Sequence, residues 1–209
     1  MARGYPTDWK KFCDIEKTYG GFSHYTLKAG TAIGDINRFA ARYALAEDFN
    51  GISISNSTEN TMLGYEALMR SLFIWSTSET YHQLLPIGSG GKYTYLSYSS
   101  TEKTSLRSAL TAIGRDMNIF YDFIANSPNL DQPHRDSVNA FLAGHDYNPT
   151  RLLSSIRHVF GHGELSANVK GVSPKSINRI TTVLKDVILG KIDSHFSVLV
   201  QNHPQYSNV

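Results

Sequence analysis

The chain has 209 residues, of which 41% are hydrophobic, and its 20 basic and 18 acidic residues give a formal net charge of +2. This composition predicts one folded domain, or one and a half, and excludes a disordered chain. Because the charges nearly balance and form no run of one sign, a protein that binds nucleic acid through a broad basic stripe is excluded as well. Any binding of nucleic acid must be local.

Cys13 is the single cysteine, which excludes an intramolecular disulfide and a cysteine-based zinc site. Residues 1–11 lack the apolar run of a signal peptide. No stretch approaches the roughly 20 apolar residues that span a bilayer. We therefore expect a soluble, cytoplasmic protein in a reducing compartment, without membrane contact.

Apolar residues at spacings of three and four predict helices over residues 8–17, 31–48 and 58–85 in the first half of the chain. Pro86 ends the third helix. Its buried stripe is expected to consist of Met62, Tyr65, Met69, Leu72, Phe73, Ser76 and Leu84.

A loop rich in glycine, serine and tyrosine follows at residues 87–98. Its Tyr93 and Tyr95 could stack on nucleobases. The interpretation we favour is that they pack on the flank of a helix.

Helix start signals are clear in the second half of the chain. Ser99 and Glu102 form a capping box, which predicts one helix that runs to residue 126. Asp131 and Pro133 open a helix over residues 131–143. Two more helices start at Asn148-Pro149 and at Ser173-Pro174, and the first of them weakens at Gly161 and Gly163.

These elements predict an all-α bundle of five to seven helices. The loop at residues 86–99 is the best candidate for a boundary. It would separate an N-terminal helical part, residues 1–99, of unknown role, from a helical core at residues 100–209 on which it packs. The two parts could also be one continuous domain.

Arg157, His158 and His162 place one guanidinium and two imidazoles within six residues. A guanidinium matches phosphate oxygens, and an imidazole can take or give a proton near neutral pH. Residues five apart lie about 140° apart on a helix, so Arg157 and His162 converge only where the helix ends or bends. Together such groups suffice to cleave RNA without a metal ion, because an imidazole moves the proton while the guanidinium stabilises charge on phosphorus.

The segment from Arg157 to His162 resembles the R-x4–6-H motif of HEPN-domain proteins, in which a polar residue follows the arginine and a glycine often follows the histidine. His158 and Gly163 occupy those places, and Arg151 with His158 forms a second match. The resemblance covers residues 100–203. It implies a HEPN-like helical core in the C-terminal half and a metal-independent endoribonuclease without a cofactor, often a toxin or defence effector.

The resemblance also implies the partners and the roles of the residues. Arg157 and His162 would be catalytic, with His158 as the polar helper. Members commonly form homodimers that bring two motifs into one cleft, and toxins of this kind have an antitoxin or another regulatory protein. The remaining candidates for binding RNA are the nearby basic residues Arg151, Lys170, Lys175 and Arg179, although a solvated surface explains them about as well.

Two other interpretations stay open. The chain could be a non-catalytic interaction or nucleotide-binding module, since arginine and histidine near the C-terminus of a helix also cap its carbonyls. His158 and His162 could instead bind zinc, with Glu164 or His145 as a third ligand. The zinc interpretation is less favoured, because no glutamate directly follows His158 as it does in zinc proteases.

Overall fold

The computed structural model describes residues 4–209 and is all-helical over that range, which confirms the predicted class. None of the described helices combines the length and the apolar character needed to cross a membrane. The described residues form eight α-helices and a final 3-10 turn: α1 (Trp9–Thr18), α2 (Ile33–Asp48), α3 (Glu59–Leu84), α4 (Ser100–Thr111), α5 (Arg115–Ala125), α6 (Gln132–Leu142), α7 (Pro149–Gly161), α8 (Pro174–Gln201) and η1 (Tyr206–Asn208).

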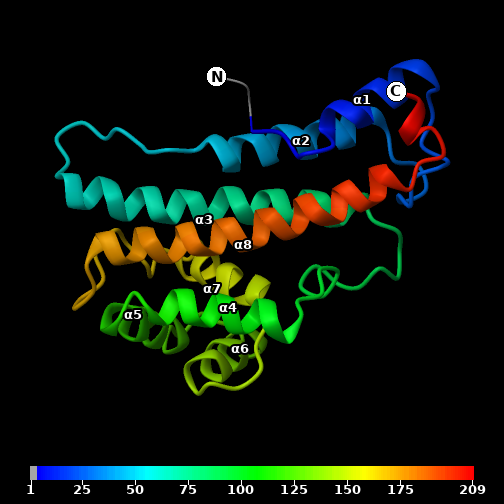
Figure 1. Ribbon diagram of the computed structural model, residues 1–209. Helices are drawn as coiled ribbons and strands as arrows, with labels where there is room; N and C mark the ends of the chain where they lie inside the picture. The colour runs from blue at the N-terminus through cyan, green and yellow to red at the C-terminus, as the bar shows by residue number, and fades with distance from the viewer. Residues whose placement is uncertain (1–3) are drawn as a thin grey trace.

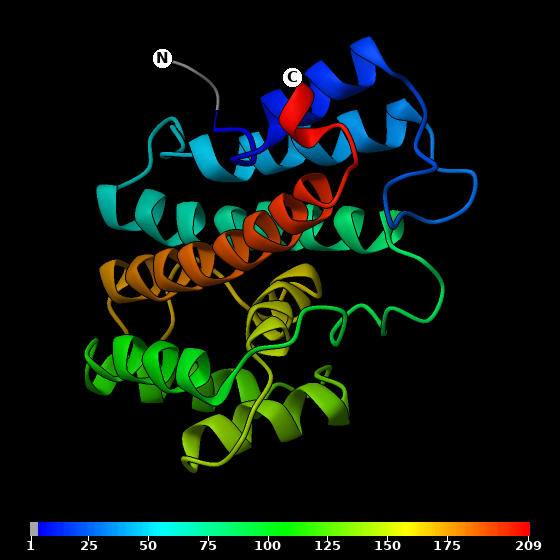
Figure 2. The ribbon, with the colours of Figure 1, turned by 45° about the vertical axis from the view of Figure 1, so that its right-hand side comes forward.

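The two longest helices, α3 and α8, lie side by side and run in the same direction in the middle of the molecule (Figures 1 and 2). Arg70 of α3 contacts Asn178 early in α8, and Tyr81, further along α3, contacts His195 further along α8. Helices α1 and α2 cover one side of this pair, and α4 to α7 lie on the other side (Figure 1). The fold therefore has three layers.

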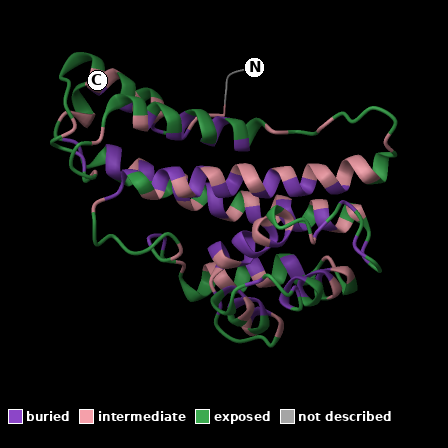
Figure 3. Ribbon diagram, turned by 180° about the vertical axis from the view of Figure 1, so that it is seen from behind, coloured by how far each residue is buried: buried purple, intermediate pink, exposed green. Residues whose placement is uncertain are grey.

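Helix α3 is covered on most of its circumference, with only Glu59, Asn60 and Gln83 exposed (Figure 3). The predicted stripe on α3 is wrong, because all of its members except Leu84 are partly exposed. Apart from the charged Arg70, the residues buried instead are small, hydroxyl-bearing or apolar: Gly64, Ala67, Leu68, Ser71, Ile74, Trp75, Thr77, Ser78, Thr80 and Tyr81. Small side chains let α2, α7 and α8 approach closely, and hydroxyls such as that of Thr77 are satisfied by carbonyls of their own helix.

The single helix predicted from residue 99 to residue 126 is also wrong, because it is two helices, α4 and α5. The capping box that starts α4 is confirmed, since the Ser99 hydroxyl accepts a bond from the Glu102 N–H and the Glu102 carboxylate accepts one from the Ser99 N–H. Gly114 then adopts a φ of 91°, which residues with a side chain rarely adopt, and this interrupts the helix. The split raises the number of helices above the predicted range.

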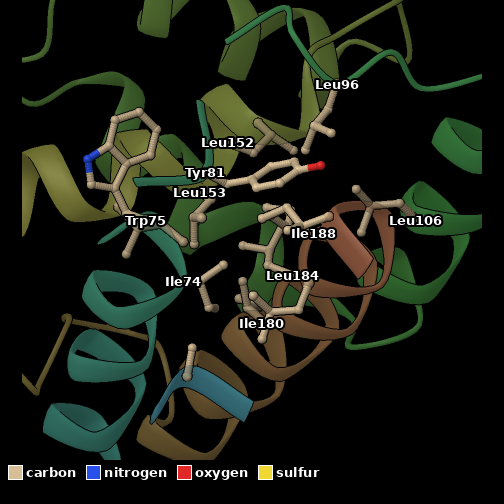
Figure 4. Packing of buried hydrophobic residues seen from close by; sticks show 14 of the residues in the cluster. Ile74, Trp75, Tyr81, Leu96, Leu106, Leu152, Leu153, Ile180, Leu184 and Ile188 are labelled. Atoms are coloured by element: carbon tan, nitrogen blue, oxygen red, sulfur yellow. The ribbon is translucent and has the colours of Figure 1, made fainter. Parts of the chain in front are cut away.

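One hydrophobic cluster extends from Phe12 in α1 to Val200 in α8. In Figure 4, the ring of Tyr81 from α3 lies between Leu152 of α7 and Ile188 of α8. Residues of both predicted parts thus share this core, and a division near residue 99 stays a prediction. The position of α7 against α3 and α8 determines where the candidate site residues lie.

Candidate functional site

Helix α7 carries the candidate site on the face that it turns away from the core. The Asn148 side chain accepts a hydrogen bond from the Arg151 N–H at 3.0 Å, and Pro149 occupies the first helical position. Leu152, Leu153, Ile156 and Val159 are fully buried and anchor the helix. Arg151 and His158 lie seven residues apart and hence on one face, and both are half-buried.

The end of α7 places His162 at the surface. Gly163 adopts a φ of 76°, and its N–H donates to the Phe160 carbonyl at 2.9 Å. The Glu164 N–H reaches back to the Val159 carbonyl at 3.2 Å, which completes a Schellman motif. The predicted end of the helix at Gly161 and Gly163 is therefore confirmed. His162 is exposed and directly follows the last turn.

Three imidazoles form a row across α6 and α7. The ring centres of His134 and His158 lie 5.7 Å apart, and those of His158 and His162 lie 4.6 Å apart. The row runs from the buried His134 through the half-buried His158 to the exposed His162.

His134 is held from both sides of its ring. Its Nδ1 lies 2.5 Å from the Asp131 carboxylate, and its Nε2 lies 3.0 Å from the Ser154 hydroxyl. Because a carboxylate can only accept, Nδ1 carries the proton, and in the neutral ring Nε2 accepts from Ser154. Burial is the main cause that lowers the pKa of His134 below its ordinary value; Asp131 opposes this shift, and the positive charges of Arg151 and His158 add to it. Burial alone would raise the pKa of the Asp131 carboxyl, but its hydrogen bonds from His134 outweigh burial and lower it.

His158 is fixed by a loop from the end of α5. Its Nε2 donates to the Asn129 carbonyl at 2.8 Å, which leaves Nδ1 as the free nitrogen. The carboxylate of Glu164 accepts hydrogen bonds from the side chains of Ser127 and Asn129 and so holds this loop. Glu164 is therefore engaged elsewhere, and within residues 4–209 no group of three or more metal-binding side chains is arranged to hold an ion.

Two arginines of α7 lie over aromatic rings and lack an acidic partner. The guanidinium carbon of Arg151 is 4.3 Å from the centre of the Tyr93 ring, and that of Arg157 is 5.8 Å from the Trp75 ring. These two rings stack on each other at 5.5 Å. Neither guanidinium forms a hydrogen bond or ion pair anywhere in the described chain, whereas the Arg135 guanidinium is occupied by three carbonyls at the end of α5 and in the following loop. The forked donors of Arg151 and Arg157 thus remain available to an anion.

The predicted residues separate into groups. Arg157 faces Trp75 of α3 while His162 contacts His158, so the two residues with the proposed catalytic roles have different neighbours. Arg151 lies on the histidine side, because its partner Tyr93 also meets the edge of the His134 ring at 5.1 Å.

The other basic residues predicted to bind RNA lie elsewhere. Lys170 lines a surface hollow beside Glu164 and Phe123. Lys175 and Arg179 are exposed in the first turns of α8. None of the three has a recorded contact with the row of imidazoles in the described residues.

The preferred interpretation of the tyrosines is confirmed. Tyr95 is buried with its hydroxyl 2.8 Å from the Ser78 hydroxyl, and Tyr93 packs on Trp75 at the flank of α3. Sequence reasoning did not place His134 or Trp75 in the site. The position of His134, three residues after the cap residue Asp131, could have indicated a contact between the two side chains. No comparable local signal marks Trp75.

No family model matches this chain, and no curated protein or solved structure is significantly similar to it. What the site does must therefore follow from its own chemistry. That chemistry consists of a row of imidazoles beside the guanidinium groups of Arg151 and Arg157, which form no ion pair within residues 4–209. Asp136 and Asp146 line the same surface hollow as Arg151, so carboxylates lie near one of the two guanidinium groups.

Proposed function

We propose that this protein is a metal-independent endoribonuclease of HEPN type. The observation that carries the proposal is a combination on α7 and its C-terminal cap residue: two guanidinium groups that form no ion pair within residues 4–209, and two imidazoles whose rings lie 4.6 Å apart. Phosphodiester cleavage needs positive charge at phosphorus and groups that move protons, and arginine and histidine supply both.

In the proposed reaction, the 2′-hydroxyl of one nucleotide attacks its own 3′-phosphorus, and the bond from phosphorus to the 5′-oxygen of the next nucleotide breaks. One imidazole accepts the 2′-hydroxyl proton, and a second donates a proton to the leaving 5′-oxygen. Arg157 stabilises the negative charge that develops on the phosphoryl oxygens. The products are a 2′,3′-cyclic phosphate and a free 5′-hydroxyl.

His162 is assigned to proton transfer, because it is the exposed end of the row and its side chain forms no hydrogen bond within residues 4–209. His158 is the helper, since its Nε2 is committed to the Asn129 carbonyl while its ring supports that of His162. In the homodimer that the HEPN resemblance implies, His162 of the second copy supplies the second imidazole.

The resemblance extends the proposal to the setting of the protein. A toxin or defence effector of this kind would act on RNA in the cytoplasm, where the exposed thiol of Cys13 stays reduced. An antitoxin or regulatory protein would hold it inactive. The molar mass in solution, measured by light scattering, tests the homodimer against the monomer mass of 23.3 kDa.

A non-catalytic nucleotide-binding module is the second candidate. It is favoured by one specific observation, which is that Arg157 and His162 have different neighbours in the folded chain. The two candidates differ in the products. An oligoribonucleotide incubated in EDTA should yield ends with a 2′,3′-cyclic phosphate, and a 2′-deoxy substitution at the cleaved nucleotide should abolish the cut. Binding of the oligonucleotide without any cut would support the module and contradict the nuclease.

A further inference from the structure

Lys92 is a third cation beside the stacked rings of Trp75 and Tyr93. The Nζ atom of Lys92, in the loop between α3 and α4, lies 5.1 Å from the centre of the Tyr93 ring and 5.7 Å from that of Trp75. Lys92 is exposed and forms no ion pair or hydrogen bond in the described part of the chain. Lys92, Arg151 and Arg157 therefore converge on Trp75 and Tyr93, and we call these five residues the cation–aromatic cluster.

The cluster also holds an unused hydrogen-bond donor. Trp75 is 3% exposed, and its indole N–H has no hydrogen-bond partner within residues 4–209. Buried polar groups usually have a hydrogen-bond partner, so this N–H is a donor that a ligand could use. Figure 4 shows the indole nitrogen on the side of the ring turned away from the apolar residues Leu153 and Ile188. The charged ends of Lys92 and Arg157 lie 5.7 and 5.8 Å from the centre of this ring, so positive charge surrounds the residue that carries the donor.

We infer that the cation–aromatic cluster binds consecutive backbone phosphates of a single-stranded polynucleotide, which continues from the α7 histidines across the loop that carries Lys92. This inference rests on the proposed function for the direction of the strand. On this path the strand does not reach Lys170, Lys175 or Arg179. Instead, its phosphates contact Lys92 and the Trp75 N–H.

The chemistry of the cluster favours a polynucleotide over other anions. Guanidinium groups held over aromatic rings present their forks in a fixed plane, which suits bidentate contact with phosphate. A lysine adds a point charge that follows the backbone of a flexible strand, and clefts of this kind combine cations with aromatic rings. An acidic peptide could satisfy the charges alone, so it is the competing occupant that the experiment must exclude.

The test uses a fluorescein-labelled 2′-O-methyl oligoribonucleotide, which cannot be cut by 2′-hydroxyl attack, so binding is measured apart from cleavage. Fluorescence anisotropy compares wild type with Lys92→Ala and with Lys17→Ala, an exposed lysine on α1 in the layer beyond α3 and α8. Lys92→Ala should bind about fivefold more weakly, which corresponds to an exposed charge pair of about 1 kcal/mol. The slope of log Kd against log salt concentration should also fall by about 0.7 for one lost phosphate contact. Lys17→Ala should bind as wild type does.

Trp75 gives a second measurement. In a Trp9→Phe variant, Trp75 is the one remaining tryptophan, and the oligonucleotide should change its emission. Equal binding by the Lys92 and Lys17 variants, no wild-type binding, or equal competition by a poly-glutamate peptide of matched charge overturns the inference. Binding that depends on Lys92, without cleavage of an unmodified strand, keeps the subsite and contradicts the nuclease. Cleavage of the unmodified strand together with binding that does not depend on Lys92 contradicts the subsite and keeps the nuclease.

Discussion

The imidazole rings of His158 and His162 lie 4.6 Å apart, and of the two only the His158 ring forms a hydrogen bond within residues 4–209. Its Nε2 donates to the Asn129 carbonyl at 2.8 Å, so the position of the outer ring depends on the inner one. His158 is thus a positioning residue for the group that we assign to proton transfer.

Replacing His158 should therefore impair catalysis through geometry. His158→Ala should lower kcat of RNA cleavage by about tenfold to a hundredfold, as misplacement of a reacting group does, with a smaller change in KM. His158→Gln should recover part of this loss, because its amide can donate to the Asn129 carbonyl. Steady-state kinetics on a fluorogenic oligoribonucleotide measures both. If the glutamine variant recovers nothing, His158 takes part in proton transfer itself.

The stability of the fold should fall on mild acidification. Burial lowers the pKa of His134, His195 and His203 below the ordinary histidine value of about 6.5. Below that value the unfolded chain binds more protons than the folded one, so the free energy of unfolding decreases as the pH falls. Around His134 the charged neighbours are Asp131, Arg151 and His158.

Urea unfolding at pH 7.5 and at pH 5 measures this effect. We expect a lower free energy of unfolding at pH 5 and a shallower pH dependence in His134→Gln, which retains groups able to bond to Asp131 and Ser154. Stability that is constant or that increases between pH 7.5 and 5 would contradict the lowered pKa values of these histidines.

Arg70 pairs with Glu66 within α3 and joins α3 to α8 through hydrogen bonds. Its guanidinium lies 2.5 Å from the Glu66 carboxylate and also donates to Asn178 and Thr181 of α8, and both charged side chains are largely buried. Arg70→Ala should destabilise the protein by about 3 kcal/mol or more, because it leaves the Glu66 charge without its partner. Lys10→Ala removes the exposed Lys10–Asp14 pair and should have a much smaller effect, because solvent screens such a pair. Chemical denaturation compares the two, and equal effects would be incompatible with this account.

Two helical glycines should respond in opposite ways to alanine. A methyl group on Gly64 of α3 would lie 2.2 Å from the Ala167 carbonyl oxygen in the loop after α7. Gly64→Ala should therefore destabilise by about 1–3 kcal/mol. Gly190 of α8 has nothing within 4 Å of that position, so Gly190→Ala should stabilise by up to about 1 kcal/mol through helix propensity. Thermal melts of the pair test the close approach of α3 to this loop.

Helix starts were predictable because their signals are local. The side chains of Ser99, Asp131, Asn148 and Ser173 all accept the expected N–H bonds. The buried face of α3 was not predictable, since a helix covered on most sides has no single apolar stripe. The break at Gly114 lies inside a periodic pattern that continues through it, so periodicity could not show it.

The candidate site was predictable only where it is continuous in sequence. Arg157, His158 and His162 are neighbours on one helix, whereas His134, Trp75 and Tyr93 reach them from α6, α3 and a loop. Their contacts with α7 depend on tertiary packing, which local spacing does not show.

The most direct test of the central claim is RNA cleavage in the presence of EDTA by wild type, His162→Ala and His145→Ala. His145 is an exposed histidine outside the row of imidazoles, so its replacement controls for the loss of a histidine. We predict cleavage that persists in EDTA, is unchanged in His145→Ala and falls by at least about a hundredfold in His162→Ala. Wild-type protein that is folded and yet cuts no RNA, or a His162→Ala variant as active as wild type, would contradict the claim.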